Sequence, residues 1–174
     1  MRVVDFDLVT LSSLIRHAFA LRSDVGLTKT AVLKQYLMQI NPHLELDAVH
    51  AFFSEQYQDQ MLAGNPTLVV DCIDGVNSKV NLIVAAREAG LPVVASMGAA
   101  AKLDPSKIRA ADISKSFMCP LAQIIRKRLR RRGVTSGVRC VFSTEAAQNK
   151  NEPVIEEALE QGVSGRPRAP IGSI

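Results

Sequence analysis

The chain has 174 residues, carries a net charge of +4 and is 47% apolar, which is enough material for one packed domain. No apolar stretch approaches the roughly 20 residues of a membrane-spanning helix, and Asp5 and Asp7 interrupt any early apolar segment of a signal peptide. The three cysteines are odd in number and widely spaced, which argues against a disulfide framework or a paired zinc site. We therefore expect an intracellular, reducing compartment, cytoplasmic or mitochondrial.

The charge is unevenly distributed along the chain. Residues 113–144 contain eight basic residues and no acidic one, whereas the remainder contains 13 basic and 17 acidic residues. Such segregation predicts a surface that binds a polyanion. The alternative is a solvated helix end without a partner.

The first elements are short. A β-branched strand is expected over residues 2–5, and Thr28 predicts the cap of a helix that runs to Ile40 and stops before an Asn-Pro pair. A second strand is expected over residues 43–49. A short helix follows around residues 52–57, whose aromatic side chains we expect in the core.

The next segment, residues 67–71, is a continuous apolar strand of the kind buried on both faces of a parallel sheet. The later elements are a helix over residues 77–88, strands over residues 92–96 and 108–113, a helix from Pro120 that Gly133 ends, and a strand over residues 138–142. This alternation predicts an α/β fold with a doubly wound, mainly parallel sheet. Beyond residue 148 we expect a poorly ordered tail with at most a short helix around residues 156–161.

Charged residues follow the first predicted strand. Asp5 ends the strand, where an acid is well placed to accept hydrogen bonds from ribose hydroxyls. Arg16 and Lys29 come shortly afterwards and supply the positive charge that a triphosphate needs. Each has a plain alternative, because a strand-terminal Asp is as often a loop residue and lone basic residues are usually solvated.

An acid also follows the apolar strand at residues 67–71. Asp74 lies just beyond its carboxyl end, where ligands of open α/β sheets bind. Its carboxylate suits Mg²⁺, because this cation prefers oxygen ligands and keeps waters and phosphate oxygens besides. The alternative is that Asp74 caps the helix that begins near Asn77.

Six segments together resemble the ThiF/MoeB-type ATP-dependent activating enzymes in order and spacing: VDFDLVTLSSLIRHAF, VGLTK, VVDCIDGVNSKV, PVVASMGAAAKLDPSKIRAADIS, PLAQIIRKRLRRRGV and CVFSTE. The resemblance covers residues 3–145. It is closest to the branch that dehydrates tRNA threonylcarbamoyladenosine to its cyclic form. It implies a partial adenylation domain with a Rossmann-like sheet over residues 1–148, followed by the tail at residues 149–174.

The resemblance also implies roles for single residues. Asp5 is similar to the residue that binds the ATP ribose, Arg16 and Lys29 to the phosphate-binding pair, and Asp74 to the acid that coordinates Mg²⁺. The implied catalytic residues are Arg16, Lys29 and Asp74, and the implied cofactors are ATP and Mg²⁺. In this family a substrate carboxylate attacks the α-phosphate, and in the dehydratase branch a carbamoyl oxygen then closes a ring and expels AMP, so no protein nucleophile is required.

The tRNA partner that the resemblance implies would bind the basic helix that begins at Pro120. Its candidate phosphate contacts are Arg126, Lys127, Arg128, Arg130, Arg131 and Arg132. Without the resemblance, an arginine-rich exposed helix is more often a solubility feature. Cys140 matches a cysteine of the dehydratase branch, but we expect Cys140 and Cys72 to be packing residues. The histidines show no metal-ligand spacing.

Two departures from the family pattern bear on function. The family fold opens with a strand, a G-x-G-x-x-G turn and a helix that cradle phosphate, and none of these precedes Arg2. Relatives carry Asn directly or three residues before the arginine, where this chain has Ile15 and Ser13. Ser13, unlike Ile15, can hydrogen-bond ATP. We therefore expect a truncated chain, incomplete at its N-terminal strand, loop and helix, with an exposed apolar sheet edge and weak or no ATP binding of its own.

The sequence also allows other functions, and it does not decide whether the chain is active. An activating enzyme for a sulfur carrier or ubiquitin-like protein is one, although the lack of C-x-x-C pairs counts against it. Another is a non-catalytic chain that folds and acts only beside a complete homologous subunit. Dimers are expected from the family. A nicotinamide-dependent dehydrogenase fits poorly, because no residue positions a hydride acceptor.

Overall fold

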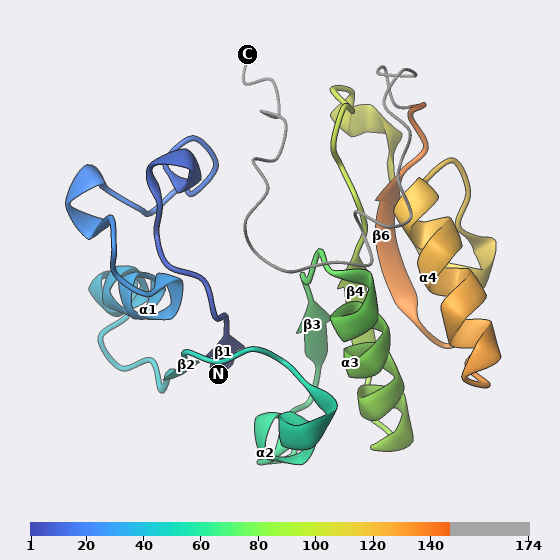
Figure 1. Ribbon diagram of the computed structural model, residues 1–174, viewed down its shortest axis with the longest axis horizontal. Coiled ribbons are helices and arrows are strands. Elements are labelled where there is room, and N and C mark those ends of the chain that lie inside the picture. The colour runs from blue at the N-terminus through green and yellow to red at the C-terminus, as the bar shows by residue number, and fades with distance from the viewer. Residues whose placement is uncertain (147–174) are drawn as a thin grey trace. The chain divides into compact units, whose positions relative to one another are not determined.

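The computed structural model describes residues 1–146, which divide into two compact units, Met1–Phe53 and a second that begins at Ser54 (Figure 1). We describe each unit by itself. The tail expected at residues 149–174, with its short helix, lies outside the described residues. No helix within residues 1–146 has the length and apolarity needed to cross a bilayer.

The first unit contains a two-stranded parallel sheet and one helix. Strand β1 (Arg2–Val4) pairs with β2 (Asp47–Val49), and helix α1 (Lys29–Ile40) lies between them in sequence. As predicted, Thr28 is the N-cap of α1, and its hydroxyl accepts a hydrogen bond from the backbone N–H of Ala31 at 3.2 Å. Strand β2 is shorter than predicted, because Asn41 closes a turn onto the residues that follow it.

The second unit contains a four-stranded sheet. Its strands are β3 (Val69–Asp71), β4 (Val93–Ser96), β5 (Ile108–Asp112) and β6 (Arg139–Ser143), in the spatial order β3-β4-β6-β5. Its helices are α2 (Gln58–Leu62), α3 (Val76–Glu88) and α4 (Pro120–Arg131). Strands β3, β4 and β6 are parallel and only β5 runs antiparallel, which confirms the predicted mainly parallel α/β sheet.

Helices α3 and α4 pack against each other on one side of this sheet (Figure 1). Ile83 of α3 and Ile125 of α4 are completely buried, as are Ala95 of β4 and Cys140 of β6. The expectation that β3 is buried on both faces was wrong, since Val70 is 61% exposed. Side chains alternate between the two faces of a strand, and the burial of β3 follows this alternation: Val69 and Asp71 are buried, whereas Val70 is exposed.

Strands β1 and β3 belong to different sheets. Within residues 1–146, β1 pairs only with β2, and β3 lies at the edge of its sheet beside β4. Of the three aromatic side chains expected in the core, only Phe53 is buried, whereas Phe52 and Tyr57 remain about half exposed.

We expect Ile83→Ala to lower the free energy of unfolding by about 2 to 5 kcal/mol, because the substitution leaves a cavity at a fully buried position. Urea unfolding followed by circular dichroism measures this loss. Ile108→Ala is the control, since Ile108 is 52% exposed and its truncation should cost less than about 1 kcal/mol. Equal losses in both variants would contradict this packing.

Candidate functional site

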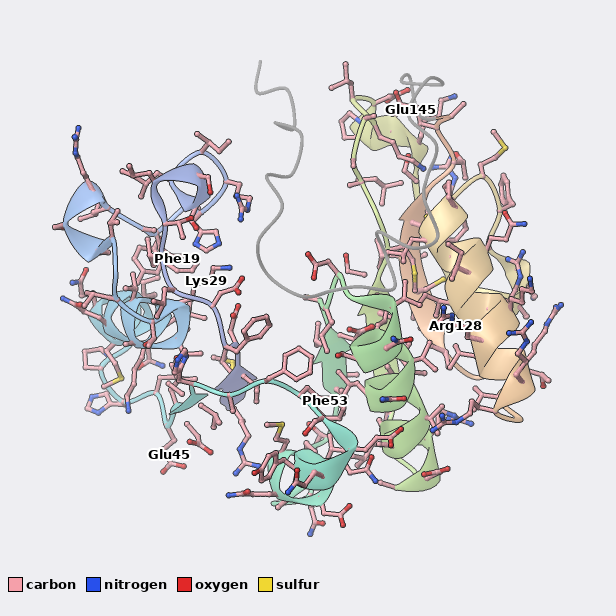
Figure 2. The ribbon with its side chains drawn as sticks, in the orientation of Figure 1. Phe19, Lys29, Glu45, Phe53, Arg128 and Glu145 are labelled. Atoms are coloured by element: carbon pink, nitrogen blue, oxygen red, sulfur yellow. The ribbon has the colours of Figure 1, made fainter. Side chains whose placement is uncertain are left out.

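In the first unit, a lysine and two acids form a connected cluster after β1. The segment that follows Asp5 runs antiparallel to the segment before α1, and the backbone N–H of Lys29 donates to the carbonyl of Asp7 at 3.0 Å. The Lys29 side chain, which is only 12% exposed, brings Nζ to 2.5 Å from Asp7 Oδ2 (Figure 2). Asp5 Oδ1 accepts the N–H of Asp7 at 2.7 Å. The structure therefore connects Asp5 and Lys29 through Asp7, which the sequence reasoning missed although it stands in the same Asp-Phe-Asp motif.

A tight turn presents Arg16. Ser13 is buried, and its hydroxyl accepts the N–H of Thr10 at 3.1 Å, so Ser13 fixes the turn. Arg16 is exposed and donates to the carbonyl of Ser12 at 2.9 Å. Ile15 is also exposed, at 62%. The geometry supports a structural role for Ser13, and its contact with ATP stays a prediction.

His17 is a second residue of this region that the sequence reasoning did not select. Burial lowers the pKa of His17, and the positive charges of Lys29 and Arg16 lower it further, while two nearby carboxylates act in the opposite direction. Both effects favour the neutral form of the imidazole. Its Nδ1 is buried and has no hydrogen-bond partner among the described residues. The ring stacks on Phe19 at a centroid distance of 5.5 Å.

In the second unit, Asp74 lies in the turn between β3 and α3. Its side chain is exposed. Helix α3 begins at Val76 with Gly75 as the N-cap, so the alternative that Asp74 is the cap residue was wrong. Within residues 1–146 there is no group of three or more acidic, histidine or cysteine side chains that could enclose a metal ion. An exposed carboxylate fits Mg²⁺, which usually combines one or two carboxylates with phosphate oxygens and water.

A buried ion pair lies beneath this turn. Asp71, the last residue of β3, and Lys79 of α3 are both completely buried, and Asp71 Oδ2 is 2.6 Å from Lys79 Nζ. The other oxygen of Asp71 accepts the N–H of Ile73 at 3.0 Å. Burial raises the pKa of Asp71, and the Lys79 ammonium and the Ile73 N–H oppose that rise. The carboxylate therefore holds the strand, the turn and the helix together.

The segment after β6 fastens the loop after β4. One carboxylate oxygen of Glu145 accepts the N–H groups of Leu103 and Asp104 at 2.9 and 2.8 Å (Figure 2). In return, Lys102 Nζ donates to the carbonyl of Ser143 at 2.8 Å. The loop that follows β4 is therefore fixed at the carboxyl edge of the sheet.

Two of the predicted tRNA-binding arginines on α4 are engaged inside the unit. Arg126 donates to the carbonyl and the hydroxyl of Ser116, the latter at 2.7 Å, and both residues are at least partly buried. Arg128 donates to the side-chain oxygen of Asn77 on α3 (Figure 2). These contacts stabilise neighbouring segments.

The exposed side of α4 carries the remaining charges. Lys127, Arg130 and Arg131 are exposed and stand three and four positions apart, so they lie on one face. Within residues 1–146 their side chains have no hydrogen bond or ion pair. Arg132 reaches the exposed Glu55 at 3.5 Å. We call Lys127, Arg130 and Arg131 the basic stripe.

Comparison with known proteins decides the family. The family model named ThiF matches residues 1–165. The chain belongs to the ThiF family. The predicted resemblance is thereby confirmed.

The chain is 40% identical over 167 residues to tRNA threonylcarbamoyladenosine dehydratase 2 of Saccharomyces cerevisiae, covering 93% of this chain and 37% of that protein. It is 34% identical over 155 residues to tRNA threonylcarbamoyladenosine dehydratase of Bacillus subtilis, covering 89% and 61%. The crystal structure of E. coli tRNA N6-threonylcarbamoyladenosine dehydratase in complex with ATP is similar with a TM-score of 0.78 and 34% identity, covering 84% of this chain and 63% of that one. The chain thus spans 37% to 63% of these relatives. The Rossmann-like fold is confirmed.

The cysteines of this ThiF-family chain differ in exposure. Cys119 and Cys140 are buried, and burial raises the pKa of the Cys140 thiol to about 11. Cys72 is exposed, so its expected packing role was wrong. It follows Asp71 directly, and alternation along the chain turns its side chain away from the covered face.

We expect a thiol reagent at pH 8 to modify Cys72 much faster than the two other cysteines, because only about one in a thousand Cys140 side chains is a thiolate there. Mass spectrometry after brief treatment with iodoacetamide identifies the modified residue. Fast modification of the native Cys72→Ser chain would contradict this prediction, and unfolding in urea should make Cys119 and Cys140 reactive.

Proposed function

We propose that this chain is the nucleotide-activating part of an ATP-dependent tRNA threonylcarbamoyladenosine dehydratase. Two observations outside the site support the proposal: the relatives bear that name, and the E. coli relative was solved in complex with ATP. The observation that carries it is the cluster after β1. There, the largely buried Lys29 pairs with the Asp7 carboxylate, and the backbone N–H of Asp7 donates to Asp5.

Each residue of the cluster has a task toward the nucleotide. Asp5, at the carboxyl end of β1, accepts hydrogen bonds from the ribose hydroxyls. Lys29 and Arg16 neutralise the charge that grows on the phosphate oxygens as the α-phosphate is attacked. Because Lys29 is already fixed by Asp7, it needs little reorganisation at that moment.

Asp74 is the proposed Mg²⁺ ligand. Mg²⁺ held by this carboxylate would supply positive charge to offset that of the phosphates. Asp74 would hold the ion through its carboxylate, and the turn between β3 and α3 positions that carboxylate.

The reaction needs no nucleophile from the protein. The substrate carboxylate attacks the α-phosphate and releases pyrophosphate, and the carbamoyl oxygen of the same substrate then attacks the activated carbonyl and releases AMP. Burial raises the pKa of the Cys140 thiol to about 11, so this thiol stays protonated and is a poor nucleophile. This supports a reaction within the substrate itself.

The basic stripe is the proposed tRNA contact. Its three side chains are exposed on one face of α4, in a region that contains no acidic residue from 113 to 144. Basic side chains of this kind bind phosphates without regard to sequence. The proposal narrows the six predicted residues to Lys127, Arg130 and Arg131, because Arg126 and Arg128 serve internal contacts and Arg132 pairs with Glu55.

A second candidate function is that the chain works only beside a homologous subunit, as a homodimer or with a full-length homologue. It is favoured by the edge position of β3 and the exposed Val70 and Leu68 next to it. Co-purification with a complete homologue, together with pyrophosphate exchange only in the mixture, would support this function. A monomer that exchanges pyrophosphate alone would exclude it.

We expect Lys29→Ala to weaken Mg-ATP binding about 10- to 100-fold, because a hydrogen bond to a charged group contributes roughly 1.5 to 3 kcal/mol. NMR titration of the 174-residue chain with Mg-ATP measures this affinity even when binding is weak. Lys34→Ala is the control, since Lys34 is an exposed lysine of the same helix. Equal affinity of the wild-type chain and Lys29→Ala would contradict the assignment.

We expect replacement of the basic stripe by Gln to reduce the slope of log affinity against log salt for tRNA by about 2 to 3, because each lost phosphate contact removes nearly one released counterion. Filter binding over a range of salt concentrations measures it. The control replaces Arg22, Lys34 and Lys107 by Gln, with the same change of charge at exposed positions outside α4. Equal slopes for both triple variants would place the tRNA contact elsewhere.

A further inference from the structure

The ion pair between Asp71 and Lys79 takes no part in the proposed chemistry. Both side chains are 0% exposed, so neither reaches a nucleotide. A buried ion pair is also a poor source of stability, because the loss of hydration largely offsets the attraction, and apolar residues of similar volume often stabilise as well or better. The buried ion pair therefore needs an explanation other than a contribution to stability.

Its contacts supply one. Asp71 closes the turn from the strand side, since its Oδ1 accepts the N–H of Ile73 at 3.0 Å. Lys79 closes it from the helix side, since its backbone N–H donates to the carbonyl of Gly75 at 3.0 Å while its ammonium binds Asp71 Oδ2 at 2.6 Å. Asp74 stands between Ile73 and Gly75, at the exposed point of this turn.

The bridge has a property that an apolar pair lacks. Two apolar side chains would fill the same space but could not accept the N–H of Ile73, and that N–H would lose its partner. The ammonium of Lys79 also fixes the rotation of the Asp71 carboxylate, so that its other oxygen faces Ile73. The ion pair thus prescribes one conformation of the turn.

We propose that Asp71 and Lys79 are positioning residues, whose buried ion pair sets the conformation of the turn 72–75 and thereby the direction of the Asp74 carboxylate. The consequence for Mg²⁺ rests on the proposed function, whereas the consequence for the turn does not. A partner behind a metal ligand typically changes metal affinity 10- to 100-fold when it is lost.

The test compares two double variants of the 174-residue chain. Asp71→Leu/Lys79→Met replaces the ion pair by apolar side chains and removes the acceptor of the Ile73 N–H. Asp71→Asn/Lys79→Met also removes the ion pair but retains an acceptor. Val80→Ala is the matched control, because it truncates the neighbouring buried residue of α3 and leaves the turn contacts in place.

The readouts are the urea midpoint, the amide exchange rates of Ile73 and Asp74 by NMR under native conditions, and the alkylation rate of the exposed Cys72. For the Leu/Met variant we expect an unchanged midpoint, with exchange and alkylation at least about tenfold faster. The Asn/Met variant should lie between it and the wild-type chain. Val80→Ala should lower the midpoint without faster exchange in the turn.

The outcomes separate this proposal from the proposed function. Exchange at Ile73 and Asp74 as slow in the Leu/Met variant as in the wild-type chain overturns the positioning role. If the Leu/Met variant does not fold, the Asn/Met variant decides by the same criterion. The Mg²⁺ concentration for half-maximal ATP binding should rise about 10- to 100-fold with the loosened turn. A wild-type chain without Mg-ATP binding would refute the proposed function, while faster exchange would still support the positioning role.

Discussion

The second unit depends on the parallel pairing of β3, β4 and β6. Parallel strands end at the same edge of a sheet, so the turn after β3, the loop after β4 and the segment after β6 meet there. The hydrogen bonds from Leu103 and Asp104 to Glu145 are a direct result, because they join residues more than 40 positions apart. Without this pairing, Asp74 would have no defined relation to the rest of its unit.

Charge in the first unit is balanced before any nucleotide arrives. A lysine that is 12% exposed loses much of its hydration, and the carboxylate of Asp7 at 2.5 Å compensates for that loss. The same carboxylate fixes where Lys29 points. A triphosphate must therefore share the Lys29 ammonium with Asp7, which weakens the attraction between Lys29 and the phosphates. In exchange, the position of the ammonium is fixed.

Much of this structure could be predicted from the sequence, and the failures have local causes. Apolar runs and the Thr28 cap identify the strands and helices, because they depend on short-range patterns. The burial of β3 was misjudged, since a run of apolar residues does not reveal how many faces of a sheet are covered. Asp7 and the partners of Arg126 were missed for a related reason: a charged residue is chosen as a ligand from its sequence neighbours, whereas its contacts come from residues distant in the chain. The roles of Asp5 and Asp74 toward the nucleotide rest on the family resemblance and stay predictions.

The contacts of α4 have a consequence for protein engineering. The arginines of this helix are not interchangeable targets for a redesign that aims to reduce binding of cellular RNA. Arg126 anchors the segment at Ser116 and Arg128 ties α4 to α3, so their removal would detach parts of the unit. Substitutions that reduce RNA binding should therefore be made in the basic stripe. There, positive charge can be removed while the contacts of Arg126 and Arg128 remain.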